Sequence, residues 1–259
     1  NINNDTKEVK LVSVYRDTYL DTGDGIFQKC NAAYAKGGPE QAISMLNVNL
    51  DLNITDYVTV DFNSIIECVD LLGGVDMEIT DDEASLMTGY IRELNELTGN
   101  KAENLTQGGT YTLNGVQACA YARIRYGGGD DYRRTERQRT VLTAMVKKAQ
   151  QSDLTTVNKL INEVCGDIQT SFSNAELLAL ASQVFQYSIG DTTGFPFTKT
   201  TKVLSKKTGD VVIPCDLSDN VKELHIFLYE DSAYTPSDTV KQNSEKIVSD
   251  TGFKSDDGH

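Results

Sequence analysis

The chain has 259 residues and a formal net charge of −14 at pH 7, with 39% hydrophobic and 24% charged residues. This composition is typical of a globular protein and excludes disordered, collagen-like and fibrous classes. The acidity argues against a nucleic-acid coat protein, because such proteins need a positive surface. The sequence has no run of about 18 apolar residues, so it predicts no membrane-spanning helix.

The five cysteines and two histidines argue against several kinds of site. The cysteines lie far apart, form no Cys-x-x-Cys pair and have apolar neighbours. This pattern predicts buried, unreactive thiols rather than zinc ligands or a redox pair. A Ser-His-Asp or Cys-His enzyme would depend on His225 alone, so the sequence does not favour a histidine-dependent hydrolase.

The first part of the chain alternates between strand and helix patterns. Alternating apolar residues predict a strand over 8–15, which we interpret as the second strand of a hairpin whose first strand lies upstream of Asn1. The next expected elements are a helix over 39–50, a strand over 56–62, a helix over 64–72, a strand over 75–79 and a helix over 81–97. Strands that alternate with helices predict an α/β layer architecture.

The second part of the chain is mainly helical. Helices are expected over 134–151, 155–165 and 173–187, and the last begins with the capping-box spacing of Ser173 and Glu176. A Gly- and Thr-rich stretch over 190–194 leads to an expected hairpin around 207–210. The chain is expected to end in a helix over 237–252 and a frayed tail over 254–259.

Six of the eight arginines fall within residues 123–139, where lysine is absent. They are Arg123, Arg125, Arg133, Arg134, Arg137 and Arg139. A positive window in an acidic chain favours a site for a phosphorylated anion, because a guanidinium group binds phosphate oxygens through two parallel hydrogen bonds. The alternatives are a solvated surface of Arg and Glu side chains and a contact with nucleic acid.

The spacing of these arginines suggests how they share a site. Arg123 and Arg125 share a face if their segment is extended and diverge if it is helical. Arg134, Arg137 and Gln138 are spaced for one face at the start of a helix, where free N–H groups and the helix dipole would strengthen an anion site. Three glycines between the two groups would allow them to converge.

Several short segments, in order, make up a specific set of motifs. They are 12–18 (VSVYRDT), 29–35 (KCNAAYA) with Gly37 and Gly38, 56–57 (DY) and 61–62 (DF), 72–76 (LGGVD), 113–115 (LNG) with Ala118, Tyr121, Arg123 and Arg125, and 131–138 (DYRRTERQ). The set covers about residues 9–149 and resembles the LytR-CpsA-Psr family. Residues 194–197 and 220–228 resemble the C-terminal extension of some members.

The resemblance implies a fold and a division of the chain. The expected fold class is α/β, an α/β/α sandwich with a central mixed sheet and a mainly helical C-terminal extension. Residues 1–150 are expected to be the LytR-CpsA-Psr catalytic core, and residues 151–259 a helical and β extension packed on the same domain.

The resemblance also implies a function and a location. The chain is expected to be a magnesium-dependent phosphotransferase that attaches an anionic glycan, such as teichoic acid or a capsule-like polymer, from a polyprenyl-pyrophosphate carrier to peptidoglycan. It is expected at the outer face of the cytoplasmic membrane of a Gram-positive-type cell, held by an anchor outside this sequence, with no nucleic-acid partner. The alternatives are a pyrophosphatase that acts on polyprenyl-pyrophosphate lipids and a non-catalytic binder of wall polyanions.

Matching the family's motifs residue by residue gives the expected site. The expected pyrophosphate-binding residues are Arg16, Lys29, Arg123, Arg125, Arg134, Arg137 and Gln138. Arg123 and Arg125 are also expected to be catalytic, and Asp131 is either a general base or an electrostatic partner of Arg134. Arg133 is not assigned to the site, Arg139 is expected on the helix surface, and an elongated apolar cavity for the polyprenyl chain is expected beside the pocket.

The expected cofactor is Mg²⁺, whose ligands the sequence does not identify. The family's magnesium aspartates belong to a Gly-x-Asp and an Arg-Ser-Asp motif, and neither motif precedes the first predicted strand here. We therefore expect either that they lie upstream of Asn1 or that this member binds the metal poorly. Asp17 follows Arg16, and metal binding, helix capping and pairing with an arginine all remain open for it.

Overall fold

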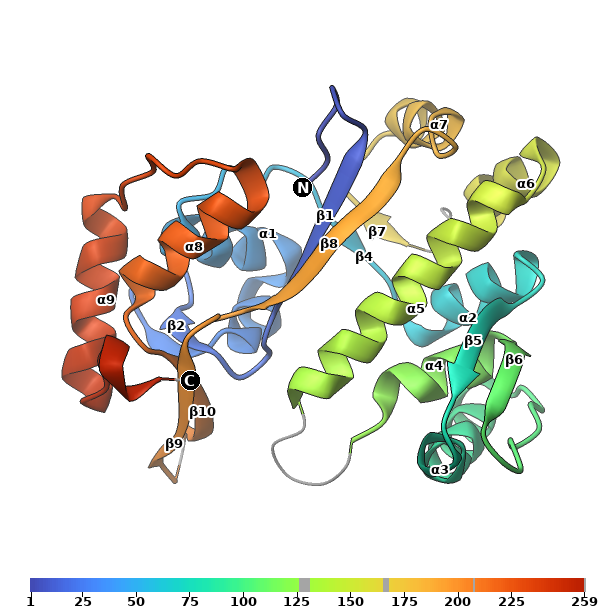
Figure 1. Ribbon diagram of the computed structural model, residues 1–259, viewed down its shortest axis with the longest axis horizontal. Helices are drawn as coiled ribbons and strands as arrows, with labels where there is room; N and C mark the ends of the chain where they lie inside the picture. Colours follow the sequence, from blue (N-terminus) through green and yellow to red (C-terminus); the bar gives the residue numbers. More distant parts are fainter. Residues whose placement is uncertain (126–130, 165–167, 207, 259) are drawn as a thin grey trace. The chain divides into compact units, whose positions relative to one another are not determined.

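The computed structural model describes residues 1–125, 131–164, 168–206 and 208–258 (Figure 1). The chain divides into two compact units. Unit 1 comprises Asn1, Val12–Tyr57 and Thr193–His259, and unit 2 comprises Ile2–Leu11 and Val58–Thr192. Neither unit ends at residue 150, so the division into a family core and an extension remains a prediction.

Unit 2 is built around helix α4 (Gly115–Arg123), which packs against α2 (Phe62–Leu71), α3 (Asp81–Thr98) and α5 (Asp131–Gln151). The antiparallel strands β5 (Val75–Ile79) and β6 (Gly109–Leu113) complete its core. Val75, Met77 and Ile79 are buried on one face of β5, as the alternating sequence predicts. Unit 2 also contains β4 (Val58–Thr59), α6 (Leu154–Val164), β7 (Gln169–Thr170) and α7 (Asn174–Ser182).

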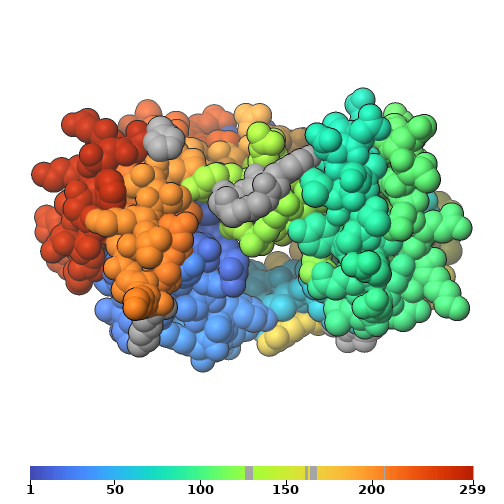
Figure 2. Space-filling view, turned by 90° about the horizontal axis from the view of Figure 1, so that it is seen from below, coloured from blue at the N-terminus to red at the C-terminus, as the bar shows by residue number. Residues whose placement is uncertain are grey.

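Unit 1 joins an N-terminal and a C-terminal segment in one hydrophobic core. The first segment supplies β2 (Tyr19–Asp21), β3 (Phe27–Lys29) and α1 (Asn31–Leu50). The second supplies β9 (Lys199–Ser205), β10 (Gly209–Pro214), α8 (Leu217–Tyr229), α9 (Asp238–Thr251) and a short 3₁₀ helix, η1 (Ser255–Asp257). Figure 2 shows the red atoms of the C-terminal region beside the orange atoms of the β9–β10 hairpin.

The α/β class is confirmed, and the strand pairing is mixed. Most strands of the described ranges pair antiparallel, whereas an isolated parallel bridge joins Thr18, beside β2, to Val212 of β10. Strand β1 (Glu8–Val14) pairs with β8 (Ser188–Phe195), and each has residues in both units. Ile2 makes an isolated antiparallel bridge to Val9 of β1, as a residue of the expected hairpin's first strand would.

Most expected elements are confirmed, and the differences have local causes. The strand expected over 56–62 is confirmed only at Val58–Thr59. Its last part is wrong because the Asp61 side chain accepts the N–H of Ser64 at 2.8 Å and starts α2. The helix expected over 39–50 is the second part of α1, which is kinked at Gly37 and Gly38. Residues 190–194 lie within β8, and the expected frayed tail contains η1.

Gly115 explains the Leu-Asn-Gly motif. A Cβ atom on Gly115 would lie 2.2 Å from the backbone oxygen of Ile66, so α2 and α4 touch through their backbones at this point. Asn114 caps α4 by accepting the N–H of Gln117 at 3.0 Å. The motif therefore starts α4 and fixes its distance from α2, and α4 ends at Arg123.

We predict that Gly115→Ala lowers the free energy of unfolding by about 1–3 kcal/mol, because the methyl group must push two helix backbones apart. Gly89→Ala is the matched control, since Gly89 is exposed within α3 and a Cβ there meets nothing within 4 Å. It should raise stability by about 0.5–1 kcal/mol. Urea unfolding followed by circular dichroism measures both, and a Gly115→Ala variant as stable as the parent would contradict this packing.

Candidate functional site

The end of α4 and the start of α5 bring two of the expected arginines together in unit 2. Arg125 Nη2 lies 2.8 Å from Asp131 Oδ1, and Arg134 Nη2 pairs with the same oxygen. Arg125 is 41% exposed at its side chain, and the Nε atom of Arg134 is buried with no hydrogen-bond partner among the described residues. Arg125 and Arg134 are therefore confirmed as neighbours around one carboxylate.

Asp131 has the geometry of an electrostatic partner. Its Oδ1 atom holds guanidinium groups from both sides of the junction between α4 and α5. This arrangement agrees with the expected pairing to Arg134, while a role as general base remains a prediction. The glycines at 127–129, expected to let the arginines converge, lie outside the described residues.

Arg123 is held by aromatic rings and one carboxylate. Its guanidinium carbon lies 4.8 Å from the ring centre of Phe62 and 5.4 Å from that of Tyr90. Nη2 donates to Glu93 Oε1 at 2.9 Å, whereas Nη1 is buried and has no hydrogen-bond partner in the described part of the chain. Arg123 is thus rigidly placed by cation–π contacts and keeps a donor for another acceptor.

Arg137 is buried and links α5 to α3 and to the end of α4. It is 7% exposed, its Nε lies 3.2 Å from Glu83 Oε1 on α3, and its Nη1 lies 3.4 Å from the backbone oxygen of Ile124. Burial, followed by the charge of Glu83, raises the pKa of Tyr121, whose ring centre lies 5.9 Å from Arg137. Arg137 therefore holds α5 against α3 and α4, and its expected contact with pyrophosphate stays a prediction, as does that of the exposed Gln138.

The other expected residues lie in unit 1 on a tight turn. Asp17 pairs with Lys29 at 3.3 Å and with Arg16 at 3.6 Å, so the pairing role considered for Asp17 is present. The buried Thr18 hydroxyl donates to the Tyr15 backbone oxygen at 2.7 Å, which closes the turn. Arg16 is consequently held by its backbone while its side chain is 53% exposed.

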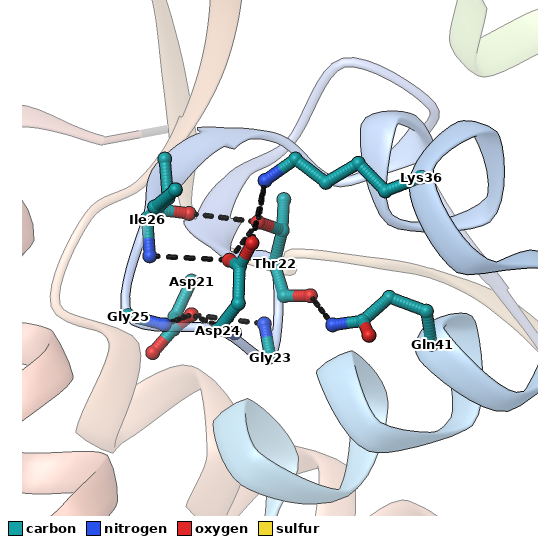
Figure 3. Close-up of polar contacts among 8 residues, drawn as sticks. All are labelled: Asp21, Thr22, Gly23, Asp24, Gly25, Ile26, Lys36 and Gln41. Carbon is teal, nitrogen blue, oxygen red and sulfur yellow. Dashed lines mark hydrogen bonds and ion pairs between the residues drawn. The ribbon is translucent and has the colours of Figure 1, made fainter.

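The loop between β2 and β3 fixes the strand that ends at Lys29 (Figure 3). Asp21 Oδ1 accepts the N–H groups of Gly23, Asp24 and Gly25 at 2.8, 3.2 and 2.9 Å. Lys36 Nζ lies 2.8 Å from Asp24 Oδ2, and hydrogen bonds from Lys36 and then the Thr22 hydroxyl lower the pKa of Asp24 to about 2. The loop's own N–H groups and Lys36 therefore occupy these carboxylates, which makes the loop structural rather than a cation site.

The described residues do not fit a magnesium site by themselves. They contain no group of three or more His, Cys, Asp or Glu side chains placed to hold a metal ion. The Asp17 carboxylate already faces two cations, which would compete with a metal.

Two of the cysteines, Cys30 and Cys119, have unreactive thiols. Cys30 and Cys119 are buried, and burial raises the pKa of each thiol to about 12. Thiols with such a high pKa are protonated at neutral pH and are poor nucleophiles. The expectation of unreactive cysteines is confirmed for these two, and Cys165 lies outside the described residues.

The model of the LytR_cpsA_psr family matches residues 1–203. The chain belongs to this family. It is 30% identical over 179 residues to the polyisoprenyl-teichoic acid–peptidoglycan teichoic acid transferase TagV of Bacillus subtilis, covering 67% of this chain and 44% of that protein. A transferase of the same description, TagU of Enterococcus faecalis, is 30% identical over 183 residues, covering 70% of this chain and 55% of that protein. This LytR_cpsA_psr chain thus spans about half the length of the curated relatives that it matches.

The fold of this LytR_cpsA_psr chain resembles that of a solved relative. The crystal structure of Bacillus subtilis TagV superposes with a TM-score of 0.68 at 26% identity, covering 91% of this chain and 87% of that one. Arg16 and Lys29 belong to unit 1, whereas the other expected site residues belong to unit 2, so their convergence on one pocket stays a prediction. The expected apolar cavity for a polyprenyl chain likewise stays a prediction.

The acidic partners of Arg123 and Arg137 were not predicted from the sequence. Glu93 pairs with Arg123 and Glu83 pairs with Arg137, both from α3. The spacing of Thr80 and Glu83 is a capping-box signal, which marks the start of α3 but not the second role of Glu83. Only the packing of α3 on α4 and α5 reveals these pairs.

We predict that Arg137→Met lowers the free energy of unfolding by about 2–3 kcal/mol, because the Glu83 side chain is only 12% exposed and loses its cation. Adding Glu83→Gln should restore part of the loss, since the charge without a partner is then removed. The exposed Arg92 on the same α3 provides the control, and Arg92→Met should change stability by less than about 0.5 kcal/mol. Equal effects of Arg137→Met and Arg92→Met in urea unfolding would show that the ion pair does not tie the helices.

Proposed function

We propose that this chain is a transferase that moves an anionic glycan from a polyprenyl-pyrophosphate carrier to peptidoglycan. The observation that carries the proposal is the grouping of Arg123, Arg125 and Arg134 at one helix junction, with buried donors on Arg123 and Arg134 that no described residue accepts. The names of the relatives TagV and TagU, which describe teichoic acid transfer to peptidoglycan, support the choice of substrates.

The chemistry of a pyrophosphate explains why arginines suit this reaction. Its oxygens are already anionic and repel a nucleophile, so catalysis depends on neutralising charge and holding the reactants in line. Guanidinium groups would bind the two phosphates through paired hydrogen bonds. Arg123, fixed between Phe62 and Tyr90, would define the position of the donor, and the more exposed Arg125 would close on it.

The transfer forms one P–O bond and breaks another. A hydroxyl of peptidoglycan attacks the phosphorus on the glycan side, and polyprenyl phosphate leaves with the electron pair of the broken bond. Asp131 would accept the proton of the attacking hydroxyl once Arg125 and Arg134 turn from its carboxylate to the phosphates. The product is a phosphodiester between glycan and wall.

Magnesium dependence and location are proposed from the family resemblance. Mg²⁺ would supply further positive charge to the pyrophosphate, and the described residues of this chain do not form its site. We place the reaction outside the cytoplasm, at the outer face of the cytoplasmic membrane of a Gram-positive-type cell, with a membrane anchor outside this sequence. Among the described residues, none of the helices combines the length and the hydrophobicity of a membrane span.

We predict that Arg123→Ala or Arg125→Ala slows magnesium-supplemented transfer by about ten- to a hundredfold, because each charge-assisted contact to the pyrophosphate contributes roughly 1.5–3 kcal/mol. Arg92→Ala, on the exposed side of α3, should stay within about twofold of the parent. The assay follows a labelled glycan from a polyprenyl-pyrophosphate donor into insoluble peptidoglycan.

Product analysis separates the rival functions. Release of free glycan phosphate at the same rate with and without peptidoglycan would indicate a pyrophosphatase. Binding of the donor without turnover would indicate a non-catalytic binder of polyanions. Turnover that is indifferent to both Arg123 and Arg125 would overturn the assignment of the site.

A further inference from the structure

Helix α5 has a second cationic face, which the pyrophosphate arginines do not use. Arg139, Thr143 and Lys147 follow one another at intervals of four residues, so they form one stripe along the helix. Arg137 lies about 200° around the helix from Arg139 and points to Glu83 instead. The two arginines therefore serve different sides of α5.

This stripe lines a cavity of about 540 Å³ within unit 2. Its walls come from α5, from Asp76 on β5 and from Gly190 and Thr192 on β8. Thr140 and Gln151 of α5 add polar groups to the lining. A cavity of this size is large enough for a small ligand such as a sugar phosphate.

Arg139, which lines this cavity, has buried donors that no described residue accepts. Its Nε and Nη1 atoms are both buried and make no hydrogen bond within the described ranges. Arg139 was expected on the helix surface, and in the structure it is partly buried on the face of α5 that lines this cavity. Buried donors without acceptors are costly, so a bound acceptor is the favoured way to satisfy them.

The charges of the cavity favour an anion beside Arg139 and Lys147. Lys148 Nζ lies 3.5 Å from Asp76 Oδ2, so these two groups largely neutralise each other. A hydrogen bond from the Thr112 hydroxyl, followed by the charge of Lys148, lowers the pKa of Asp76, which keeps Asp76 ionised in this role. Arg139 and Lys147 then face one remaining carboxylate of the lining, Glu136, which is exposed.

We propose that this cavity binds a phosphorylated sugar unit of the anionic glycan, at a site separate from Arg123 and Arg125. The proposal rests on the proposed function for the identity of the polymer. The guanidinium group of Arg139 and the ammonium group of Lys147 would bind the phosphate, as charged donors do. Thr143, Thr192 and Gln151 would exchange hydrogen bonds with sugar hydroxyls.

Calorimetric titration of the chain with N-acetylglucosamine 1-phosphate tests the site. The parent should bind this probe, and Arg139→Gln or Lys147→Gln should weaken binding at least tenfold. Arg92→Gln and Lys101→Gln remove the same charges from exposed positions outside the cavity and should leave binding within twofold. Because Lys147 is exposed, Lys147→Gln tests the site even if Arg139→Gln does not fold.

The binding measurements can overturn or support the cavity site. No binding by the parent, or equal binding by the parent and the Lys147→Gln variant, would overturn it. Inorganic phosphate bound as tightly as the sugar phosphate would reduce the site to an anion hole and overturn the sugar assignment, whereas weaker binding of phosphate and of neutral N-acetylglucosamine supports it.

Binding of a second ligand distinguishes failure of the cavity site from failure of the proposed function. A short-chain polyprenyl pyrophosphate should bind the Lys147→Gln variant as it binds the parent, and it should bind Arg125→Ala more weakly. If the lipid pyrophosphate fails to bind the parent while the sugar phosphate binds, the proposed function fails and the cavity site stands. Loss of lipid binding in Lys147→Gln would show that the cavity serves the carrier instead and would overturn the separate site.

Discussion

The ion pair between Glu83 and the buried Arg137 is the constraint on which the rest of the site depends. It joins the start of α3 to α5, and the same guanidinium group reaches the backbone oxygen of Ile124, just after α4. These contacts fix the helix end that carries Arg123 relative to the helix start that carries Arg134. Removing either partner would leave the other charge buried, so the pair tolerates little variation.

The arginines around this pair differ in how firmly they are held. Arg137 is fully engaged inside the protein, and Arg123 is fixed by two aromatic rings and Glu93 but keeps one buried donor. Arg125 and Arg134 both pair with Asp131, and the side chain of Arg125 is more exposed than that of Arg134. In the proposed reaction, this combination of rigid and adjustable cations would hold the pyrophosphate and still allow the product to leave.

Local patterns predicted much of the fold. The alternation in β5, the capping box at Ser173 and the acidic start of α3 each mark an element that the structure confirms. Helix α4 escaped prediction because it is buried on nearly all sides, so its sequence lacks the polar stripe that reveals a surface helix. The strand expected over 56–62 failed because the cap at Asp61 outweighed the β-branched and aromatic residues before it.

Family motifs predicted the arginines but not their partners. The grouping of Arg125 and Arg134 follows from residues close in the chain, whereas Arg123 depends on Phe62 and Glu93 from two other helices. The surroundings of Arg139 were not predicted either, because its cavity is completed by β8, about 50 residues further along the chain. Contacts between distant segments have no signature in a single sequence.

The most direct test of the arginine site is a crystal structure of this chain with a short-chain polyprenyl pyrophosphate bound. We expect oxygens of the pyrophosphate to lie about 3 Å from guanidinium nitrogens of Arg123, Arg125 and Arg134. A pyrophosphate bound away from Arg123 and Arg125, with both still paired to Glu93 and Asp131, would contradict it.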